Sequence, residues 1–198
     1  MIWLVTLLML LAAAPARAQS FEVTPFFGYS NAKTIDTTTL GVDDLQIDGG
    51  FTYGGTATYF ISDRIGFEGL FAQQPTEVSM TVNGATAPVF DMKVTQFLGN
   101  VVFEPFSRKA PLRAFVFGGL GTTVMSGQDF ETSSHFAWTI GGGVKWFPSS
   151  SSSVGARLHA RYSGTRLNDS GSATCAPFGF CEDALPRFEL AGGVILRF

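Results

Sequence analysis

The stretch of sequence that decides the fold is residues 187–198, which read Arg-Phe-Glu-Leu-Ala-Gly-Gly-Val-Ile-Leu-Arg-Phe. Every even-numbered position in it is apolar or glycine, whereas the odd-numbered positions include Arg187, Glu189 and Arg197. Because successive side chains of a β-strand point to opposite faces, this alternation predicts a strand with one continuous apolar face and one face that carries charge. The apolar face ends on the aromatic ring of Phe198.

The same alternation recurs in seven segments further upstream. Each segment is long enough, at roughly 9–11 residues, to cross a bilayer as a tilted strand. The eight predicted strands are 21–30, 51–61, 65–75, 93–104, 112–124, 135–147, 154–163 and 187–198. An even number of antiparallel strands is what a closed bacterial membrane barrel requires. We therefore predict an all-β fold, an eight-stranded antiparallel up-and-down transmembrane β-barrel.

The connections between these segments alternate in length. The short ones are 62–64, 105–111 and 148–153, and the long ones are 31–50, 76–92, 125–134 and 164–186. In membrane barrels of this kind the short turns are periplasmic and the long loops extracellular, which predicts that both termini are periplasmic.

Asn83-Gly84 lies between two alternating stretches within the second long connection. This dipeptide is typical of a type I′ hairpin turn, so strands 65–75 and 93–104 are predicted to continue as a hairpin beyond the membrane. We expect the edges of this hairpin to be unpaired and therefore able to recruit an extended partner by strand addition.

The composition agrees with a barrel whose outer face meets lipid. Charged residues make up 15% of the chain, against roughly 25% in ordinary soluble domains. Glycine (23) and phenylalanine (20) are abundant, and the formal net charge is −3. This charge excludes the basic footprint of a nucleic-acid-binding protein.

The two faces of the predicted strands differ in side-chain size. One face is mostly small, as in Thr52, Gly54, Thr56, Thr58, Ala137, Thr139, Gly141 and Gly143. Such residues suit the crowded lumen of an eight-stranded barrel. The other face carries aromatic residues near strand ends, which predicts two interfacial girdles: Phe51, Tyr59, Phe136, Trp138, Trp146, Tyr162, Phe188 and Phe198. A secreted lipocalin-like carrier is the alternative, but its water-facing side should be rich in charge.

The N-terminal segment is predicted to be a secretory signal peptide. Residues 2–14 are an apolar run, and Ala16-Arg17-Ala18 has the small-x-small pattern of a cleavage site. The run is too short for a membrane-spanning helix, although a retained anchor is the alternative. The predicted organisation is a signal peptide over 1–18 and one barrel domain over 19–198.

Eight ionisable residues fall on the predicted inner face of the strands. They are Glu68, Glu104, Lys145, Arg157, His159, Arg161, Arg187 and Glu189. In a narrow lumen each charge needs a partner, because an unpaired buried charge is costly. We predict a polar network that plugs the barrel. A narrow ion or small-solute channel, gated by exchanging pairs, is the alternative.

Cys175 and Cys181 lie in a segment rich in Gly, Ser and Pro. In an exported chain a disulfide bond is the expected state of such a pair. A metal-binding pair is the weaker alternative, since no histidine or third cysteine lies nearby. We predict neither a cofactor nor a metal site.

Arg161-Tyr162-Ser163 resembles the His-Tyr-Ser motif of lipid A 3-O-deacylases, a family of outer-membrane esterases. That resemblance would make Ser163 the nucleophile. The position of the general base is occupied by Arg161, which stays protonated and cannot accept the serine proton. The prediction is therefore that the protein is not an enzyme.

Taken over residues 21–198, the chain resembles the small outer-membrane β-barrel family typified by the OmpA transmembrane domain and OmpX. The resemblance rests on the signal peptide, the eight alternating segments, the rhythm of long and short connections and the terminal Phe198. It implies a monomer in the bacterial outer membrane, in contact with outer-membrane lipids and lipopolysaccharide. It further implies that Phe198 is the insertion signal read by the barrel-assembly machinery. Members of the family serve as structural scaffolds or as surface interaction modules, which is the predicted function.

Overall fold

The computed structural model describes residues 21–31, 34–35, 44–47, 49–82, 85–106, 110–127, 132–149, 151–166 and 184–198. Their regular elements are the strands β1 (Phe21–Asn31), β2 (Thr34–Ile35), β3 (Asp44–Ile47), β4 (Gly50–Phe60), β5 (Ile65–Val82), β6 (Ala85–Phe103), β7 (Leu112–Gly127), β8 (Ser133–Trp146), β9 (Val154–Arg166) and β10 (Ala184–Arg197). Within these ranges no helix is long and apolar enough to cross a membrane. The predicted signal peptide and both cysteines lie outside the described residues.

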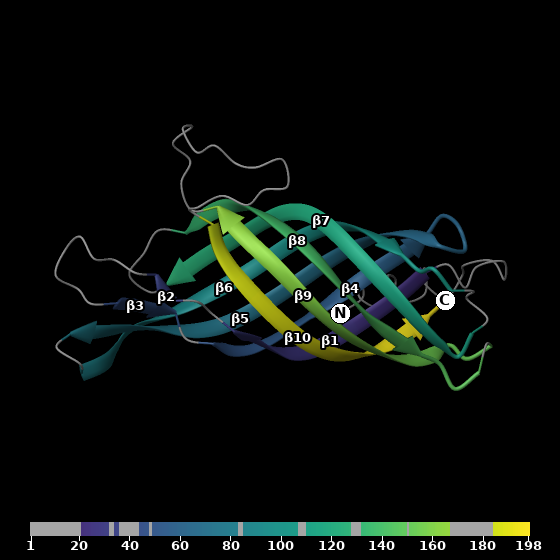
Figure 1. The fold of residues 1–198 in the computed structure, drawn as a ribbon, viewed down its shortest axis with the longest axis horizontal. Coiled ribbons are helices and arrows are strands. Elements are labelled where there is room, and N and C mark those ends of the chain that lie inside the picture. The colour runs from purple at the N-terminus through teal and green to yellow at the C-terminus, as the bar shows by residue number, and fades with distance from the viewer. Residues whose placement is uncertain are drawn as a thin grey trace, which may run out of the picture.

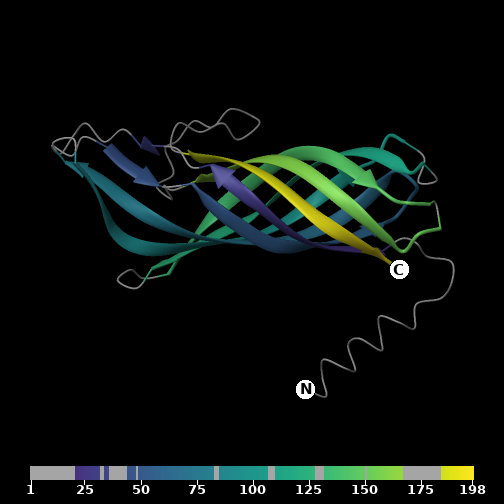
Figure 2. The ribbon, with the colours of Figure 1, turned by 90° about the horizontal axis from the view of Figure 1, so that it is seen from below.

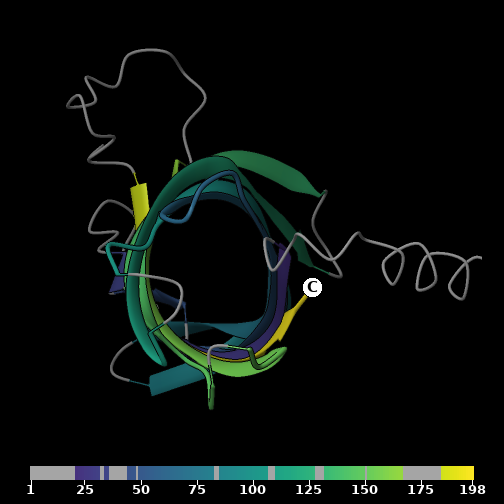
Figure 3. The same ribbon diagram turned by 90° about the vertical axis from the view of Figure 1, so that its right-hand side faces the viewer.

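The eight long strands form a closed antiparallel barrel, as the alternation predicted. Each of the strands β4 to β9 pairs with the next one along the chain, and β1 pairs with both β4 and β10. Figure 1 shows the tilted strands from the side, and Figure 3 shows the ring that they close when viewed along the barrel. The connections β4–β5, β6–β7 and β8–β9 lie at one end, which we call the short-turn end. The opposite end is called the long-loop end.

The seam of the barrel joins the first and last strands. The pairing of β1 with β10 runs from Glu22↔Arg197 to Asn31↔Phe188. At the short-turn end the backbone N–H of Phe198 donates to the carbonyl oxygen of Phe21 at 2.9 Å, and the two rings lie 6.3 Å apart. The ring of strands is therefore hydrogen-bonded through to its last residue.

The two faces of the strands separate as the sequence predicted. The outward-facing Phe51 is 62% exposed, whereas its inward-facing neighbour Thr52 is 1% exposed. Large apolar side chains cover the outside of every barrel strand, where they are exposed on the isolated chain. An apolar outer surface with a polar interior is the reverse of a soluble barrel and suits a lipid environment.

The inward-facing glycines allow the strands to coil tightly. A Cβ atom at Gly143 would lie 2.0 Å from the carbonyl oxygen of Leu158, and one at Gly121 would lie 2.0 Å from that of Phe97. These positions therefore have no room for a side chain. At the outward-facing Gly69, by contrast, a Cβ atom would meet nothing within 4 Å.

This contrast predicts opposite outcomes for two alanine substitutions. Gly143→Ala should lower the free energy of unfolding by about 1–3 kcal/mol, because the neighbouring strand must move to admit the methyl group. Gly69→Ala is the matched control and should change stability by less than about 0.5 kcal/mol. Urea unfolding of the two variants in lipid vesicles measures the difference, and equal stabilities would show that the close approach at Gly143 relaxes without cost.

Two strands extend far beyond the others at the long-loop end. β5 and β6 have 18 and 19 residues, and their pairing continues to Val82↔Ala85, with a register shift between Val78 and Ser79. Figure 2 shows this hairpin projecting past the rest of the barrel. The predicted continuation of the hairpin is thus confirmed, although the Asn83-Gly84 turn itself lies outside the described residues.

The hairpin edges differ from the prediction on one side. β3 pairs with the projecting part of β5, with Leu45 opposite Met80, and β2 pairs with β3. The expectation of a free β5 edge was therefore wrong, because a segment of the first long connection covers it. On the other side β6 pairs with β7 only as far as Met92↔Gly127. Among the described residues, 85–91 have no strand partner other than β5.

Candidate functional site

All eight ionisable residues singled out from the sequence lie inside the barrel. Their exposed fractions range from 0% for Glu104 and Lys145 to 8% for Arg187. They come from β5, β8, β9 and β10 and from Glu104 directly after β6, always at positions whose side chains alternate inward. The structure does not gather them at one point. Glu104 and Lys145 lie in one charged cluster, and Arg161, Arg187 and Glu189 lie in a second. Glu68 and Arg157 form a separate ion pair, and His159 lies in an apolar layer between the two clusters.

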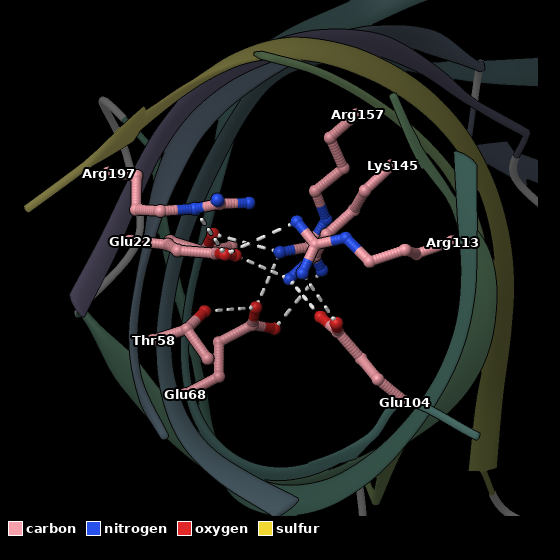
Figure 4. Close-up of polar contacts among 9 residues, drawn as sticks. Glu22, Thr58, Glu68, Glu104, Arg113, Lys145, Arg157 and Arg197 are labelled. Atoms are coloured by element: carbon pink, nitrogen blue, oxygen red, sulfur yellow. Dashed lines mark hydrogen bonds and ion pairs between the residues drawn. The ribbon is translucent and has the colours of Figure 1, made fainter. Parts of the chain in front are cut away.

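The first cluster fills the short-turn end of the lumen. We call it the short-turn cluster, and its members are Glu22, Glu104, Arg113, Lys145 and Arg197. Lys145 Nζ lies 2.6 Å from Glu22 Oε2 and 2.7 Å from Glu104 Oε1. Arg113 Nη1 donates to Glu104 Oε2 at 3.1 Å, and Arg197 Nε lies 3.5 Å from Glu22 Oε1. Figure 4 shows these side chains converging on the barrel axis.

Aromatic rings line the same end and lie against the cations. The guanidinium carbon of Arg113 lies 4.4 Å from the centroid of the Phe147 ring, and that of Arg197 lies 3.7 Å from the same centroid. Lys145 Nζ lies 4.9 Å from the Phe60 centroid. Such cation–π contacts stabilise cations that have lost their water.

One further ion pair lies beside this cluster, where Arg157 and Lys145 both contact the ring of Phe115. Arg157 binds Glu68 through both of its terminal nitrogens, at 2.5 and 3.3 Å. Glu68 also accepts hydrogen bonds from Thr58 Oγ1 at 2.9 Å and from Asn100 Nδ2 at 3.2 Å. The carboxylate is therefore fully enclosed by donors from β4, β6 and β9.

An apolar layer crosses the lumen next to this ion pair, on the side of the long-loop end. Leu70 on β5 and Leu98 on β6 are the next inward positions after Glu68 and Asn100 toward the long-loop end, and both pack with Phe26. His159, the inward position after Arg157, has its ring 5.3 Å from that of Phe26. The alternation did not predict this layer, because large apolar residues stand on both faces of β1 and β7.

The second cluster lies toward the long-loop end. We call it the long-loop cluster, and its members are Ser30, Arg161, Arg187 and Glu189. Arg161 donates from Nε and Nη2 to the two oxygens of Glu189, at 2.6 and 2.7 Å. Arg187 Nη2 lies 3.3 Å from Ser30 Oγ. His159 Nε2 approaches Glu189 Oε1 to 3.8 Å, and neither of its ring nitrogens has a hydrogen-bond partner among the described residues.

Sequence reasoning missed three residues of the short-turn cluster. Glu22, Arg113 and Arg197 are 1%, 0% and 4% exposed and lie within one or two residues of a strand end. The available signal was their position in the alternation, since each lies an even number of residues from other inward-facing positions of its strand. Position at a strand end made them resemble solvated residues of the rim.

The Arg161-Tyr162-Ser163 motif does not form a catalytic arrangement. Ser163 is 4% exposed and lies on the inner face, away from the lipid-facing surface. Arg161, in the place of the general base, is held by both oxygens of Glu189. Among the described residues no group of three or more His, Cys, Asp or Glu side chains could hold a metal ion.

Several solved structures of outer-membrane proteins have a similar fold. Neisserial surface protein A has a TM-score of 0.62 at 16% identity, with 90% of this chain and 97% of that chain covered. OprG from Pseudomonas aeruginosa gives 0.59 at 12% identity, covering 90% and 95%. The N-terminal barrel domain of Pseudomonas aeruginosa OprF gives 0.51 at 14% identity, covering 91% and 98%.

These likenesses concern the fold alone, because their sequence identities are low. No curated protein matches the sequence at a significant level. A family model, described as the outer membrane protein beta-barrel domain, matches residues 4–176. The matched range spans most of the chain, and the barrel with its apolar outer surface and charged interior agrees with it. The chain therefore belongs to the family of outer membrane β-barrel proteins.

Proposed function

We propose that this protein is a non-enzymatic outer-membrane scaffold that serves as a surface interaction module through its projecting β-sheet. The observation that carries the proposal is the extension of β5 and β6 beyond the barrel, joined by β3 and β2. The part of this hairpin that exceeds the length needed to cross the bilayer has no role in spanning it. We infer that the short-turn end and both termini face the periplasm and that the extension faces outward.

The filled lumen supports a scaffold rather than a conducting pore. Lys145 and Glu104 are fully buried and bind one another, and the layer of Phe26, Leu70 and Leu98 lies across the axis above them. An ion crossing this lumen would have to break buried ion pairs and pass apolar side chains. Both steps are costly in a poorly hydrated interior.

The edge of β6 over residues 85–91 is the proposed contact surface. Its outer backbone groups have no strand partner among the described residues, so they can bind an extended polypeptide by strand addition. Pro88 removes one donor from this stretch, which limits indiscriminate pairing with other sheets. The partner is therefore an extended segment of a protein on a host cell, in the matrix or on a neighbouring bacterium.

The proposal also includes the partners implied by location. Outer-membrane lipids and lipopolysaccharide would contact the apolar outer face, and Phe198 would present the insertion signal to the barrel-assembly machinery. The protein would act as a monomer, because the barrel pairs both of its own terminal strands.

Replacing residues 77–90 by a tight turn tests the interaction role. The barrel should still fold, because the pairings that close it lie outside this segment, whereas adhesion to cells or matrix should fall to the level of a strain without the protein. Heat-modifiability on gels checks folding, and a binding assay on whole bacteria measures adhesion. Arg157→Gln, which changes the lumen alone, is the control and should bind as wild type.

Planar-bilayer recordings of the same variants separate the two candidate functions. Undiminished adhesion after the truncation, together with an ion conductance that Arg157→Gln alters, would replace the scaffold by the narrow channel.

A further inference from the structure

Among the described residues, buried cations outnumber buried carboxylates in the lumen. Glu22, Glu68, Glu104 and Glu189 are four carboxylates, whereas the buried cations are Arg113, Lys145, Arg157, Arg161, Arg187 and Arg197. Five of these six cations lie within 4.0 Å of a carboxylate. In the part of the chain that the structure describes, Arg187 forms no ion pair, and its hydrogen bond is to the neutral hydroxyl of Ser30.

The carboxylate beside Arg187 is that of Glu189, which already binds another arginine. Both oxygens of Glu189 bind Arg161, at 2.6 and 2.7 Å, so they are engaged by a bidentate pair. Arg161 Nη1 has no hydrogen-bond partner among the described residues. Two guanidinium groups on the neighbouring strands β9 and β10 thus share one carboxylate. An uncompensated buried charge of this kind is costly unless an anion accompanies it.

Arg187 is also the most accessible of the six cations. It retains 8% exposure, compared with 0% for Arg113 and Lys145. It lies near the start of β10, at the long-loop end, with Ser163 opposite it in register on β9 and Ser30 on β1. The apolar layer of Phe26, Leu70 and Leu98 separates it from the short-turn cluster. A solute from the loop side therefore meets Arg187 before any other lumen cation.

We propose that Arg187, with Ser30 and the positive charge of Arg161, forms a binding site for a soluble oxyanion, a carboxylate or a phosphate group. The planar guanidinium fork matches the two oxygens of such a group better than it matches a spherical halide. The hydroxyl of Ser30 supplies a further donor beside it. The site makes the long-loop mouth of the barrel selective for anionic groups without requiring passage through the lumen.

Calorimetric titration of inorganic phosphate and of acetate tests the site on the folded protein in nanodiscs. Sodium chloride should be adjusted to keep the ionic strength constant. We expect saturable binding with one site per barrel, and Arg187→Gln should weaken it by roughly tenfold or more, as expected for the loss of a charge-assisted hydrogen bond. Arg166→Gln is the matched control, because it removes the same charge from the same end of the barrel, at an outward-alternating position of β9. It should bind phosphate and acetate as wild type does.

The stability of Arg187→Gln gives a second, independent readout. Without oxyanions the variant should melt at the same temperature as wild type or higher, because it removes an uncompensated buried charge. With phosphate present only the wild type should gain thermal stability. Nanodiscs with and without lipid A distinguish free phosphate from the phosphate groups of a lipid, and only the sample without lipid A should respond fully to added phosphate.

Two results would overturn the site. One is the absence of saturable phosphate and acetate binding by the wild type at constant ionic strength. The other is a loss of stability in Arg187→Gln that is the same with and without oxyanions, since this would make Arg187 a structural member of the wall.

Discussion

Glu104→Ala is expected to lower the free energy of unfolding by about 3–5 kcal/mol, the range for breaking a buried ion pair by removing one partner. Glu104 is the carboxylate that binds both Lys145 at 2.7 Å and Arg113 at 3.1 Å. Its removal leaves three cations of the short-turn cluster facing Glu22 alone. Urea unfolding in lipid vesicles, followed by tryptophan fluorescence, measures the loss.

The control and the rescue distinguish charge from packing. Asp63→Ala, at an exposed position in the β4–β5 turn of the same end, should change stability by less than about 0.5 kcal/mol. The double variant Glu104→Leu/Lys145→Met should be more stable than Glu104→Ala, because replacing both partners by apolar residues removes the unpaired charge of Lys145. A double variant as unstable as Glu104→Ala would mean that the cluster contributes through packing.

Val194→Arg is expected to prevent stable insertion of most of the protein. Val194 is 50% exposed and alternates outward on β10, between Gly192 and Leu196. A charged side chain on the lipid face near the midplane costs roughly 2–4 kcal/mol. For a barrel of ordinary stability this is a large fraction of the total. The yield of folded, heat-modifiable protein in the outer-membrane fraction measures the effect.

Ser151→Arg provides the comparison for this substitution. Ser151 is exposed in the β8–β9 turn, where an added charge remains in water, so its yield should match wild type. Equal yields from Val194→Arg and Ser151→Arg would be incompatible with the lipid-facing position of β10.

The fold was predictable because one physical constraint acts along the whole chain. Each strand must present apolar side chains to lipid, so the alternation survives in all eight of them. Apart from the projecting ends of β5 and β6, the strands start and end within three residues of the predicted bounds. The association of β3 with the projecting part of β5 was not predictable. Residues 44–47 are too few to show a period, and their pairing depends on the position of a hairpin that is distant in sequence.

The lumen was predictable in its residue types but not in its layers. Alternation placed Glu68, Arg157 and Glu189 inside, yet it carries no information on which charge meets which. Those contacts depend on strand tilt and on side-chain length across the barrel. Phe26 and Phe117 were not recognised as inward-facing, because their neighbours Phe27 and Val116 are equally apolar and the period of two disappears locally.

The seam between β1 and β10 has a consequence for the way in which the barrel is made. Ser30 and Arg187, which meet across it, are 157 positions apart in sequence. Contacts of such separation form slowly, since the entropy of closing the whole chain must be lost before they are gained. Until they form, the sheet has two open edges with apolar faces, which can pair with other chains. Closure therefore distinguishes a protected product from an aggregation-prone precursor, and a chain delayed before that step is exposed to proteases and to its own copies.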